Sequence, residues 1–179
     1  YGACRVCSVE VQHTEDGPKR TVASCHTPIN PGMRIYTNSD SVKTLRRNIV
    51  ELVLSDHPPD CLTCEVNGNC ELQDVAASVG VRKIRYAKGK NHCDREKDLS
   101  HAYMRMDLSK CINCSRCVRA CDEVQGQFTL TMTGRGFESR ITTDNDMLFG
   151  DSSCVSCGAC AQTCPTSAIS DVFQSKSVE

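Results

Sequence analysis

The sequence predicts an α+β fold built from several small units, each with a thin apolar core. Three observations favour it: short strand-like and helix-like patterns follow one another along the chain, aromatic residues are scarce, and cysteine is abundant. Of the 179 residues 15 are Cys, only 4% are aromatic, and Trp is absent. So few large apolar side chains bury little surface, and small folds of this kind usually depend on metal or disulfides.

Charge and hydropathy argue against two classes of function. The formal net charge is −1, from 21 basic and 22 acidic residues, so we expect no binding to nucleic acid. Neither a secretory signal nor a long apolar run is visible, and we therefore expect no membrane span and a cytoplasmic location. In that compartment disulfides are disfavoured, and clustered cysteines more often bind metal.

Residues 1–37 predict a mostly β unit. Val6, Val9 and Val11 form a strand-like run, and a turn at 15–18 follows it. Further short strands are expected at 21–23 and 34–37.

Residues 38–80 predict a small helical unit. One helix is expected over 41–54, and His57-Pro58-Pro59 stops it. Its apolar face, at helical spacing, comprises Val42, Leu45, Ile49, Leu52 and Val53. A second helix is expected over 71–79, with Gly80 at its C-terminal end.

Residues 81–102 are charged and irregular, and we expect them to form a connector. Residues 103–179 predict a third unit that begins and ends with a strand. A hairpin turned at Gly134-Arg135-Gly136 is expected inside it. The four expected strands cover 103–107, 128–132, 137–141 and 168–172.

The strongest motif is a four-cysteine run that occurs twice in the third unit. Its spacing, C-x2-C-x2-C-x3-C, is typical of bacterial proteins that hold two [4Fe–4S] clusters. The runs are Cys111, Cys114, Cys117 and Cys121, then Cys154, Cys157, Cys160 and Cys164, which Pro165 follows. In each run we expect the first three thiols on a tight loop and the fourth at the start of a helix.

The fourth cysteine of such a run ligates the other cluster. The expected ligand sets are therefore Cys111, Cys114, Cys117 with Cys164, and Cys154, Cys157, Cys160 with Cys121. Zinc is the alternative metal, but it usually takes two C-x2-C pairs, or two Cys with two His, and fits this spacing poorly.

A third metal site is predicted between the two helices of the 38–80 unit. Its expected ligands for a further [4Fe–4S] cluster are His57, Cys61, Cys64 and Cys70. A neutral imidazole in place of a thiolate makes a cluster less negative, so we expect a higher potential than that of an all-cysteine cluster. The alternative is an ordinary helix-end histidine beside a three-thiolate cluster or a zinc site.

A fourth site is predicted near the beginning of the sequence. Plant-type [2Fe–2S] sites use C-x4-C-x2-C…C, and Cys4, Cys7 and Cys25 match the last three ligands. Gly2 and Ala3 are small enough for a loop that wraps a cluster closely. Since Tyr1 is not an initiator Met, we expect a stretch of a longer chain, with the missing ligand upstream. The alternative is three unrelated thiols beside a β-hairpin.

One cysteine is left over, and catalytic residues are not apparent. Cys93 lies in the polar connector, where we expect a free thiol without a ligand role. No nucleophile–base set is evident, nor a site for a nicotinamide, a flavin or a pterin.

The order of these motifs, over nearly all of the chain, resembles an electron-input module that several redox enzymes share. It is similar to the N-terminal regions of the complex I large iron–sulfur subunit, [FeFe]-hydrogenases, the diaphorase small subunit of NAD-reducing hydrogenases and NAD-dependent formate dehydrogenase alpha subunits. The motifs that carry the resemblance cover residues 2–7, 57–74 and 111–165. Two stretches, 117–137 and 154–160, favour formate dehydrogenase, and residues 171–179 resemble the lead-in to its molybdopterin domain.

The resemblance implies a fold and a function. It implies a β-grasp, plant-type [2Fe–2S] portion, a small helical unit with the one-histidine cluster, and a bacterial two-cluster ferredoxin-like unit. Electrons from formate oxidation at a molybdenum or tungsten bis-pterin site outside this stretch would cross three [4Fe–4S] clusters and one [2Fe–2S] cluster. Its partners would be the catalytic pterin domain or subunit and a flavin, NAD-binding diaphorase subunit.

Three other hypotheses remain at this point. The chain could be the electron-transfer subunit of an NAD-linked [NiFe]- or [FeFe]-hydrogenase, a free-standing ferredoxin-type carrier, or a zinc-stapled interaction module. Complex I subunits usually keep only one of the two ferredoxin clusters, so the eight cysteines of the repeat argue against that member of the group.

Overall fold

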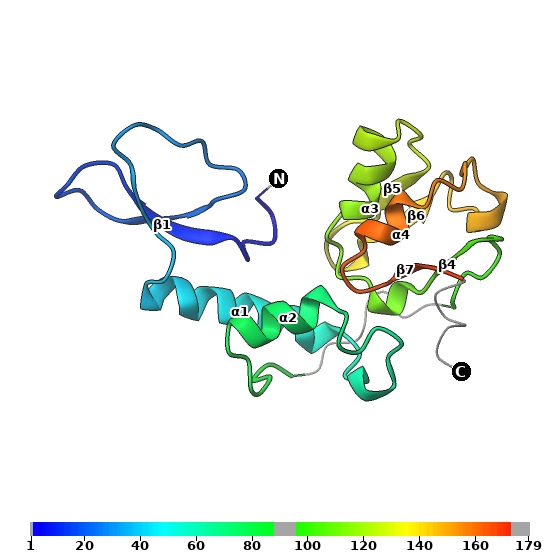
Figure 1. Cartoon of the computed structure of the whole chain (residues 1–179), viewed down its shortest axis with the longest axis horizontal. Coiled ribbons are helices and arrows are strands. Elements are labelled where there is room, and N and C mark those ends of the chain that lie inside the picture. The colour runs from blue at the N-terminus through cyan, green and yellow to red at the C-terminus, as the bar shows by residue number, and fades with distance from the viewer. Residues whose placement is uncertain (1, 88–95, 173–179) are drawn as a thin grey trace. The chain divides into compact units, whose positions relative to one another are not determined.

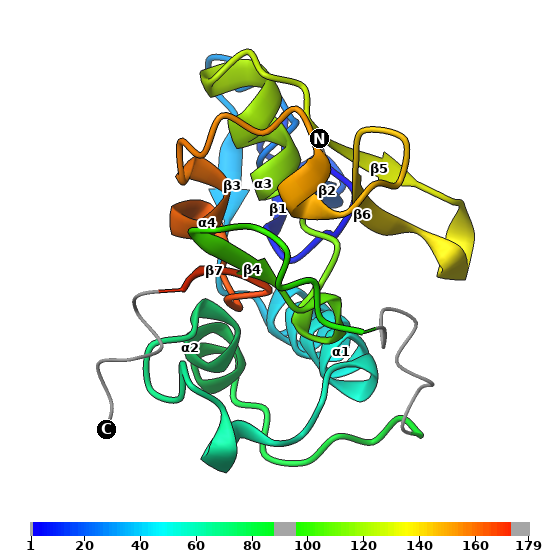
Figure 2. The same ribbon diagram turned by 90° about the vertical axis from the view of Figure 1, so that its right-hand side faces the viewer.

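The computed structural model describes residues 2–87 and 96–172 (Figure 1 and Figure 2). The chain divides into two compact units, Tyr1–Ser55 with Asp74–Ala87, and Asp56–Gln73 with Lys88–Glu179. The segment predicted as one unit over 38–80 is thus shared between them. No helix among the described residues combines the length and apolar character needed to cross a bilayer.

The first unit contains a three-stranded antiparallel sheet in the order β2-β1-β3. Its strands are β1 (Ser8–Gln12), β2 (Arg20–Ala23) and β3 (Arg34–Tyr36). Val9 and Val11 of the central strand are buried. In the register, Val9 faces Val22 of β2 and Val11 faces Ile35 of β3. The predicted strands at 21–23 and 34–37 are confirmed to within one residue at each end.

Two helices complete this part of the chain, α1 (Asp40–Asp56) and α2 (Glu71–Ser78). The end predicted for α2 is confirmed, because Gly80 has a positive φ of 70° and the N–H of Val81 donates to the carbonyl of Ala76. This is the usual left-handed termination of a helix.

The apolar face predicted for α1 is partly wrong. Val42 and Val50 are fully buried, but Leu52 is 51% exposed. At about 100° per residue, Leu52 lies about 80° around the helix from Val42, at the margin of the stripe. Glu51 is buried instead, and its carboxylate accepts a hydrogen bond of 2.7 Å from Arg85.

The second unit is closed by a two-stranded antiparallel sheet that joins the beginning and end of the cysteine repeat. Its strands are β4 (Met104–Met106) and β7 (Ile169–Asp171). They lie side by side in both views (Figure 1 and Figure 2). Both strands were predicted, and their pairing brings the two cysteine runs together.

The hairpin inserted between the runs is confirmed, but its strands begin two and three residues later than predicted and end one and two residues later. They are β5 (Leu130–Thr133) and β6 (Arg140–Thr143). The turn is longer than three residues and includes a 3-10 helix at Gly136–Glu138. A Cβ on Gly134 would lie 2.3 Å from the carbonyl oxygen of Glu138, so this turn requires glycine there.

Each cysteine run enters a short helix. These are α3 (Arg116–Arg119), which continues as a π-helical turn at Ala120–Val124, and α4 (Ala159–Thr163). Further 3-10 turns lie at Cys61–Thr63, Leu108–Lys110 and Phe149–Asp151.

The expectation that the fourth cysteine opens a helix is wrong. Cys117 and Cys160, the third of each run, lie inside α3 and α4, whereas Cys164 follows the end of α4. The residues just before the helices, Ser115 and Gly158, have positive φ angles of 60° and 76°. Such left-handed residues end the preceding loop, so each helix begins one residue before the third thiol.

The second unit's core is small and contains cysteines. The buried cluster has nine members, of which Phe149 is the one aromatic residue: Met104, Met106, Cys117, Cys121, Leu130, Ile141, Phe149, Cys160 and Ile169. Three of these nine are predicted metal ligands, so part of the core is also part of the site.

Candidate iron–sulfur centres

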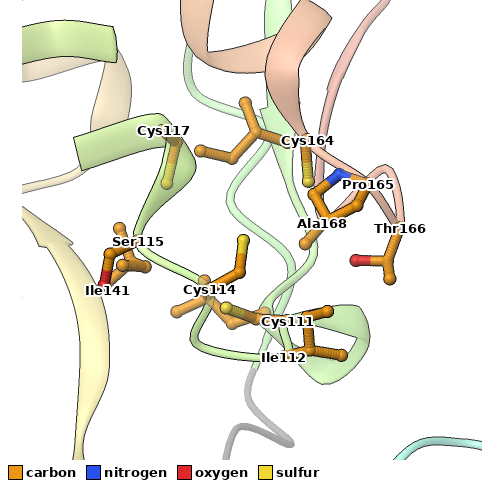
Figure 3. A pocket seen from close by; sticks show the side chains of 12 residues that line it. Cys111, Ile112, Cys114, Ser115, Cys117, Ile141, Cys164, Pro165, Thr166 and Ala168 are labelled. Atoms are coloured by element: carbon orange, nitrogen blue, oxygen red, sulfur yellow. The ribbon is translucent and has the colours of Figure 1, made fainter. Parts of the chain in front are cut away.

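The first predicted ligand set of the repeat lines one cavity. Its cysteines are Cys111, Cys114, Cys117 and Cys164. Figure 3 shows the sulfur atoms of Cys114, Cys117 and Cys164 turned toward the same space. The remaining lining is mostly apolar, including Leu108, Ile141 and Pro165.

The second predicted set lines a separate cavity. Its cysteines are Cys121, Cys154, Cys157 and Cys160. Met104, Leu130 and Phe149 supply apolar walls. Each cavity therefore takes three thiols from one run and one thiol from the other.

Backbone amides point at sulfur in both loops. The N–H of Asn113 lies 3.4 Å from Cys111 Sγ, and the N–H of Ser156 lies 3.4 Å from Cys154 Sγ. Asn113 and Ser156 both have positive φ angles. The two halves of the repeat thus use the same loop geometry, and N–H donors of this kind help to set the potential of an iron–sulfur cluster.

Burial keeps these thiols protonated in the absence of metal. Desolvation, reinforced by neighbouring cysteines, raises the pKa of Cys160 to about 12 and that of Cys117 further. Desolvation also raises the pKa of Cys114 and of Cys154. A metal that bound these thiols would therefore have to displace a proton from each of them.

The thiols of each predicted set line one cavity, but they do not form a preformed single-ion site. Among the described residues, no three His, Cys, Asp or Glu side chains converge on one point closely enough for one metal ion. None of the fourteen described cysteines forms a disulfide.

The third predicted set lies on the loop between α1 and α2. Cys61 is exposed, Cys64 is half-buried and Cys70 is buried. His57 Nδ1 is buried and has no hydrogen-bond partner among the described residues. Burial lowers the pKa of His57, with Asp60 opposing and Lys110 assisting. A buried imidazole that is neutral and lacks a partner fits a metal ligand, and its role stays a prediction.

This loop rests on the cysteine repeat within the second unit. The backbone N–H of Glu71, next to Cys70, donates to the carbonyl of Pro165, next to Cys164, over 3.1 Å. The guanidinium of Arg116 donates hydrogen bonds of 2.6 and 2.7 Å to the Glu71 carboxylate. These hydrogen bonds lower the pKa of Glu71. The His57 loop and the first cavity are therefore neighbours.

In the first unit the structure brings together two of the three predicted [2Fe–2S] ligands. Burial would raise the pKa of Cys7, but hydrogen bonds from Cys25 and Ser24 outweigh it and lower the pKa. Ser24 also donates to the carbonyl of Cys7 through its N–H and its hydroxyl, over 3.3 and 2.9 Å. Cys4 is exposed.

The loop before Cys4 is tightly packed, and the leftover thiol is not placed. Gly2 has a φ of +72°, and a Cβ there would lie 3.3 Å from the Cβ of His26. This agrees with the close wrapping expected of a small residue. Cys93 lies outside the described residues, so the expectation of a free thiol stays a prediction.

Sequence reasoning missed a buried histidine behind the second cavity. His101 Nδ1 accepts hydrogen bonds from the backbone N–H groups of Tyr103 and Met104, both 3.1 Å long. The ring proton therefore sits on Nε2, which lies 3.2 Å from the hydroxyl oxygen of Ser156. His101 thus supports the loop between Cys154 and Cys157. A single histidine in a charged connector carries no sequence signal for this role.

Replacing His101 with Ala should destabilise the metal-loaded protein. The buried N–H of Met104 would lose its acceptor, which costs about 1–3 kcal/mol for a buried unsatisfied group, and the half-buried N–H of Tyr103 would lose its acceptor too. The ring packed 4.8 Å from Phe149 would also be lost. Thermal unfolding followed by circular dichroism measures the effect. The exposed His13 supplies the control variant His13→Ala. Equal midpoints for the two variants would refute a supporting role for His101.

Three protein-family models match successive parts of the chain. Residues 1–40 match a 2Fe-2S iron-sulfur cluster binding domain. Residues 46–85 match the NADH-ubiquinone oxidoreductase-G iron-sulfur binding region. Residues 110–168 match a 4Fe-4S dicluster domain. The order of these models follows the order of the predicted sites.

Curated relatives are much longer than this chain. It is 41% identical over 167 residues to the NADP-reducing hydrogenase subunit HndD of Solidesulfovibrio fructosivorans, covering 93% of this chain and 28% of that protein. It is 32% identical over 167 residues to an NADH-quinone oxidoreductase subunit of Rhizobium meliloti (strain 1021), covering 93% of this chain and 19% of that protein.

A solved structure extends the likeness to the fold. A chain of an NAD+-reducing [NiFe]-hydrogenase, crystallised in the H2-reduced state, matches with a TM-score of 0.84 and 30% identity. The match covers 96% of this chain and 70% of that chain. This chain belongs to the family of iron–sulfur regions that NADH-quinone oxidoreductases and NAD-reducing hydrogenases share.

Proposed function

We propose that this chain conducts electrons through iron–sulfur clusters between an NAD(P)-linked flavin partner and a catalytic unit. One observation carries the proposal: the eight cysteines of the repeat line two cavities, and each run sends its fourth thiol to the cavity of the other. Two [4Fe–4S] clusters bound in this way would share their ligand-bearing helices. The His57 loop would hold a third [4Fe–4S] cluster, and Cys4, Cys7 and Cys25 would supply three ligands to a [2Fe–2S] cluster.

The shared helices would keep successive clusters close. Cys117 lines the first cavity and Cys121 the second, although both lie on one continuous helical segment. Four residues of helix advance by about 6 Å. The contact between Glu71 and Pro165 holds the His57 loop against the first cavity in the same way. Because neighbouring clusters would lie close together, this arrangement favours successive short electron transfers over a set of independent cluster sites.

Two catalysts are candidates for the distal end of this route. The sequence resemblance favours an NAD-dependent formate dehydrogenase, with a molybdenum or tungsten bis-pterin site outside this stretch. The 41% identity to the NADP-reducing hydrogenase subunit favours hydrogen oxidation instead. Neither catalyst would draw a catalytic residue from the region described here.

The two candidates differ in the substrate that reduces the clusters of the full-length protein. Anaerobic protein, with its natural partners, is mixed with formate or with hydrogen, and the bleaching of visible absorption is followed. A formate dehydrogenase bleaches with formate alone, and a hydrogenase bleaches with hydrogen alone. Bleaching by NAD(P)H, with neither substrate effective, would support the electron route and reject both catalysts.

A reductive titration tests electron transfer apart from any catalyst. Three [4Fe–4S] clusters and one [2Fe–2S] cluster would take up about four electrons per chain, one each. Dithionite is added in measured portions while electron paramagnetic resonance records the reduced clusters. Uptake of fewer than about two electrons would contradict the proposed chain of clusters.

The proposed His57 ligand makes a separate prediction. The variant His57→Cys should retain a cluster, but at a lower midpoint potential, because a thiolate adds negative charge that a neutral imidazole lacks. A redox titration followed by electron paramagnetic resonance measures the change, and His13→Cys, at an exposed position in the first unit, is the control. If no midpoint moves downward, His57 does not bind the cluster.

A further inference from the structure

Lys110 connects the His57 loop with the first cavity. Its ammonium Nζ lies 3.6 Å from Cys64 Sγ, one of the predicted ligands on that loop. Its own neighbour in the chain, Cys111, lines the first cavity. The side chain of Lys110 thus contacts a predicted ligand on the His57 loop, while its backbone lies next to a predicted ligand of the first cavity.

The backbone of Lys110 is held independently of its side chain. Its carbonyl oxygen accepts a hydrogen bond of 2.7 Å from the hydroxyl of Thr166, and its N–H donates to the carbonyl of Asp107 over 3.2 Å. These bonds position the loop at Cys111 whatever side chain stands at 110. The ammonium is therefore free to serve another purpose than local folding.

The nearby carboxylate is paired with another cation. Asp107, three positions before Lys110, is bound to Lys97 at 3.1 Å. The ammonium of Lys110 is directed instead to Cys64 Sγ.

A cation that donates a hydrogen bond to a ligand sulfur stabilises the reduced cluster, which carries one more negative charge. Hydrogen bonds to sulfur and net charge are two of the factors that set the potential of iron–sulfur clusters. The effect adds to that of an imidazole ligand, because both make the site less negative.

We propose that Lys110 raises the midpoint potential of the cluster held by His57, Cys61, Cys64 and Cys70 relative to the cluster in the first cavity. The inference rests on the proposed function. In the step concerned, the first cavity's cluster loses one electron and the His57 site gains it, and no atom moves. Lys110 would therefore favour the reduced state of the cluster on the His57 loop.

The test is a charge series at position 110 in the iron-loaded full chain. Lys110→Arg, Lys110→Met and Lys110→Glu are titrated with dithionite under electron paramagnetic resonance. The cluster whose signal moves in His57→Cys identifies the site. Its midpoint should stay near that of the parent in Lys110→Arg, fall in Lys110→Met and fall further in Lys110→Glu. Lys43→Met, an exposed position on α1, is the control for general loss of charge.

Each outcome has a definite meaning. A graded fall of that one midpoint, with Lys43→Met unchanged, supports the inference. Equal midpoint potentials in all Lys110 variants, or equal midpoint shifts of all clusters, would overturn the inference. The presence of the clusters themselves would still be established. Iron and sulfide contents are measured on the same samples. If the proposed function were wrong, the parent protein would contain neither. Their presence therefore distinguishes a failure of the Lys110 inference from a failure of the proposed function.

Discussion

Replacing Cys121 with Ser should remove the cluster that the second cysteine run holds, although Cys121 belongs to the first run. Cys121 lines the same cavity as Cys154, Cys157 and Cys160. The variant should lose about four of its iron atoms, one cluster's content. Because a [4Fe–4S] cluster needs its four ligands, the reciprocal variant Cys164→Ser should remove the cluster of the first cavity.

Double variants show which thiols share a cluster. Cys121 and Cys154 line one cavity, so Cys121→Ser with Cys154→Ser should lose about four iron atoms, no more than either single variant. Cys121 and Cys114 line different cavities, so Cys121→Ser with Cys114→Ser should lose about eight. Iron is measured per chain after anaerobic purification.

The opposite pattern would mean that each run binds its own cluster. In that case Cys121→Ser with Cys114→Ser would lose about four iron atoms and Cys121→Ser with Cys154→Ser about eight. The variant Ser109→Ala, close to the first cavity but outside both sets of lining residues, controls for loss of iron through general damage.

Removal of iron should unfold the second unit. Three of the nine residues in its buried cluster are Cys117, Cys121 and Cys160, and Phe149 is the one large aromatic side chain among them. Without a cluster, the two cavities would leave apolar walls facing empty space or water, and packing contacts would be lost. Small metal-binding domains commonly fold only with their metal.

Far-UV circular dichroism during chelation measures this directly. Under reducing conditions an iron chelator should cause a large loss of ellipticity that parallels the loss of visible absorption. The two signals should follow one time course, because the metal and the fold depend on each other. An unchanged far-UV spectrum after complete iron loss would show that the apolar core suffices without metal.

Local sequence signals predicted most of the secondary structure. The turn residues and β-branched runs placed β2 and β3 within one residue and β1 within two, because Val6 lies before the strand, and the glycine at 80 gave the end of α2. The spacing of the cysteines also predicted how the eight thiols of the repeat divide between two cavities. These features depend on short stretches of chain or on the chemistry of a ligand set.

Features that depend on tertiary contact were not predicted. The burial of Glu51 requires Arg85, which is 34 positions away, and so the apolar face assigned to α1 included the exposed Leu52. Lys110 and Cys64 are 46 positions apart, and His101 and Ser156 are 55 apart. No periodicity or spacing in the sequence joins such pairs, because only the tertiary fold of each unit brings these distant residues together.

If the cysteines of this chain hold iron–sulfur clusters, the protein must contain inorganic sulfide as well as iron. Acid-labile sulfide and iron are measured per chain after anaerobic purification of the full-length protein. Three [4Fe–4S] clusters predict about 12 of each from this region, and a filled [2Fe–2S] site adds about two. Zinc in place of iron, with sulfide close to zero, would contradict the account.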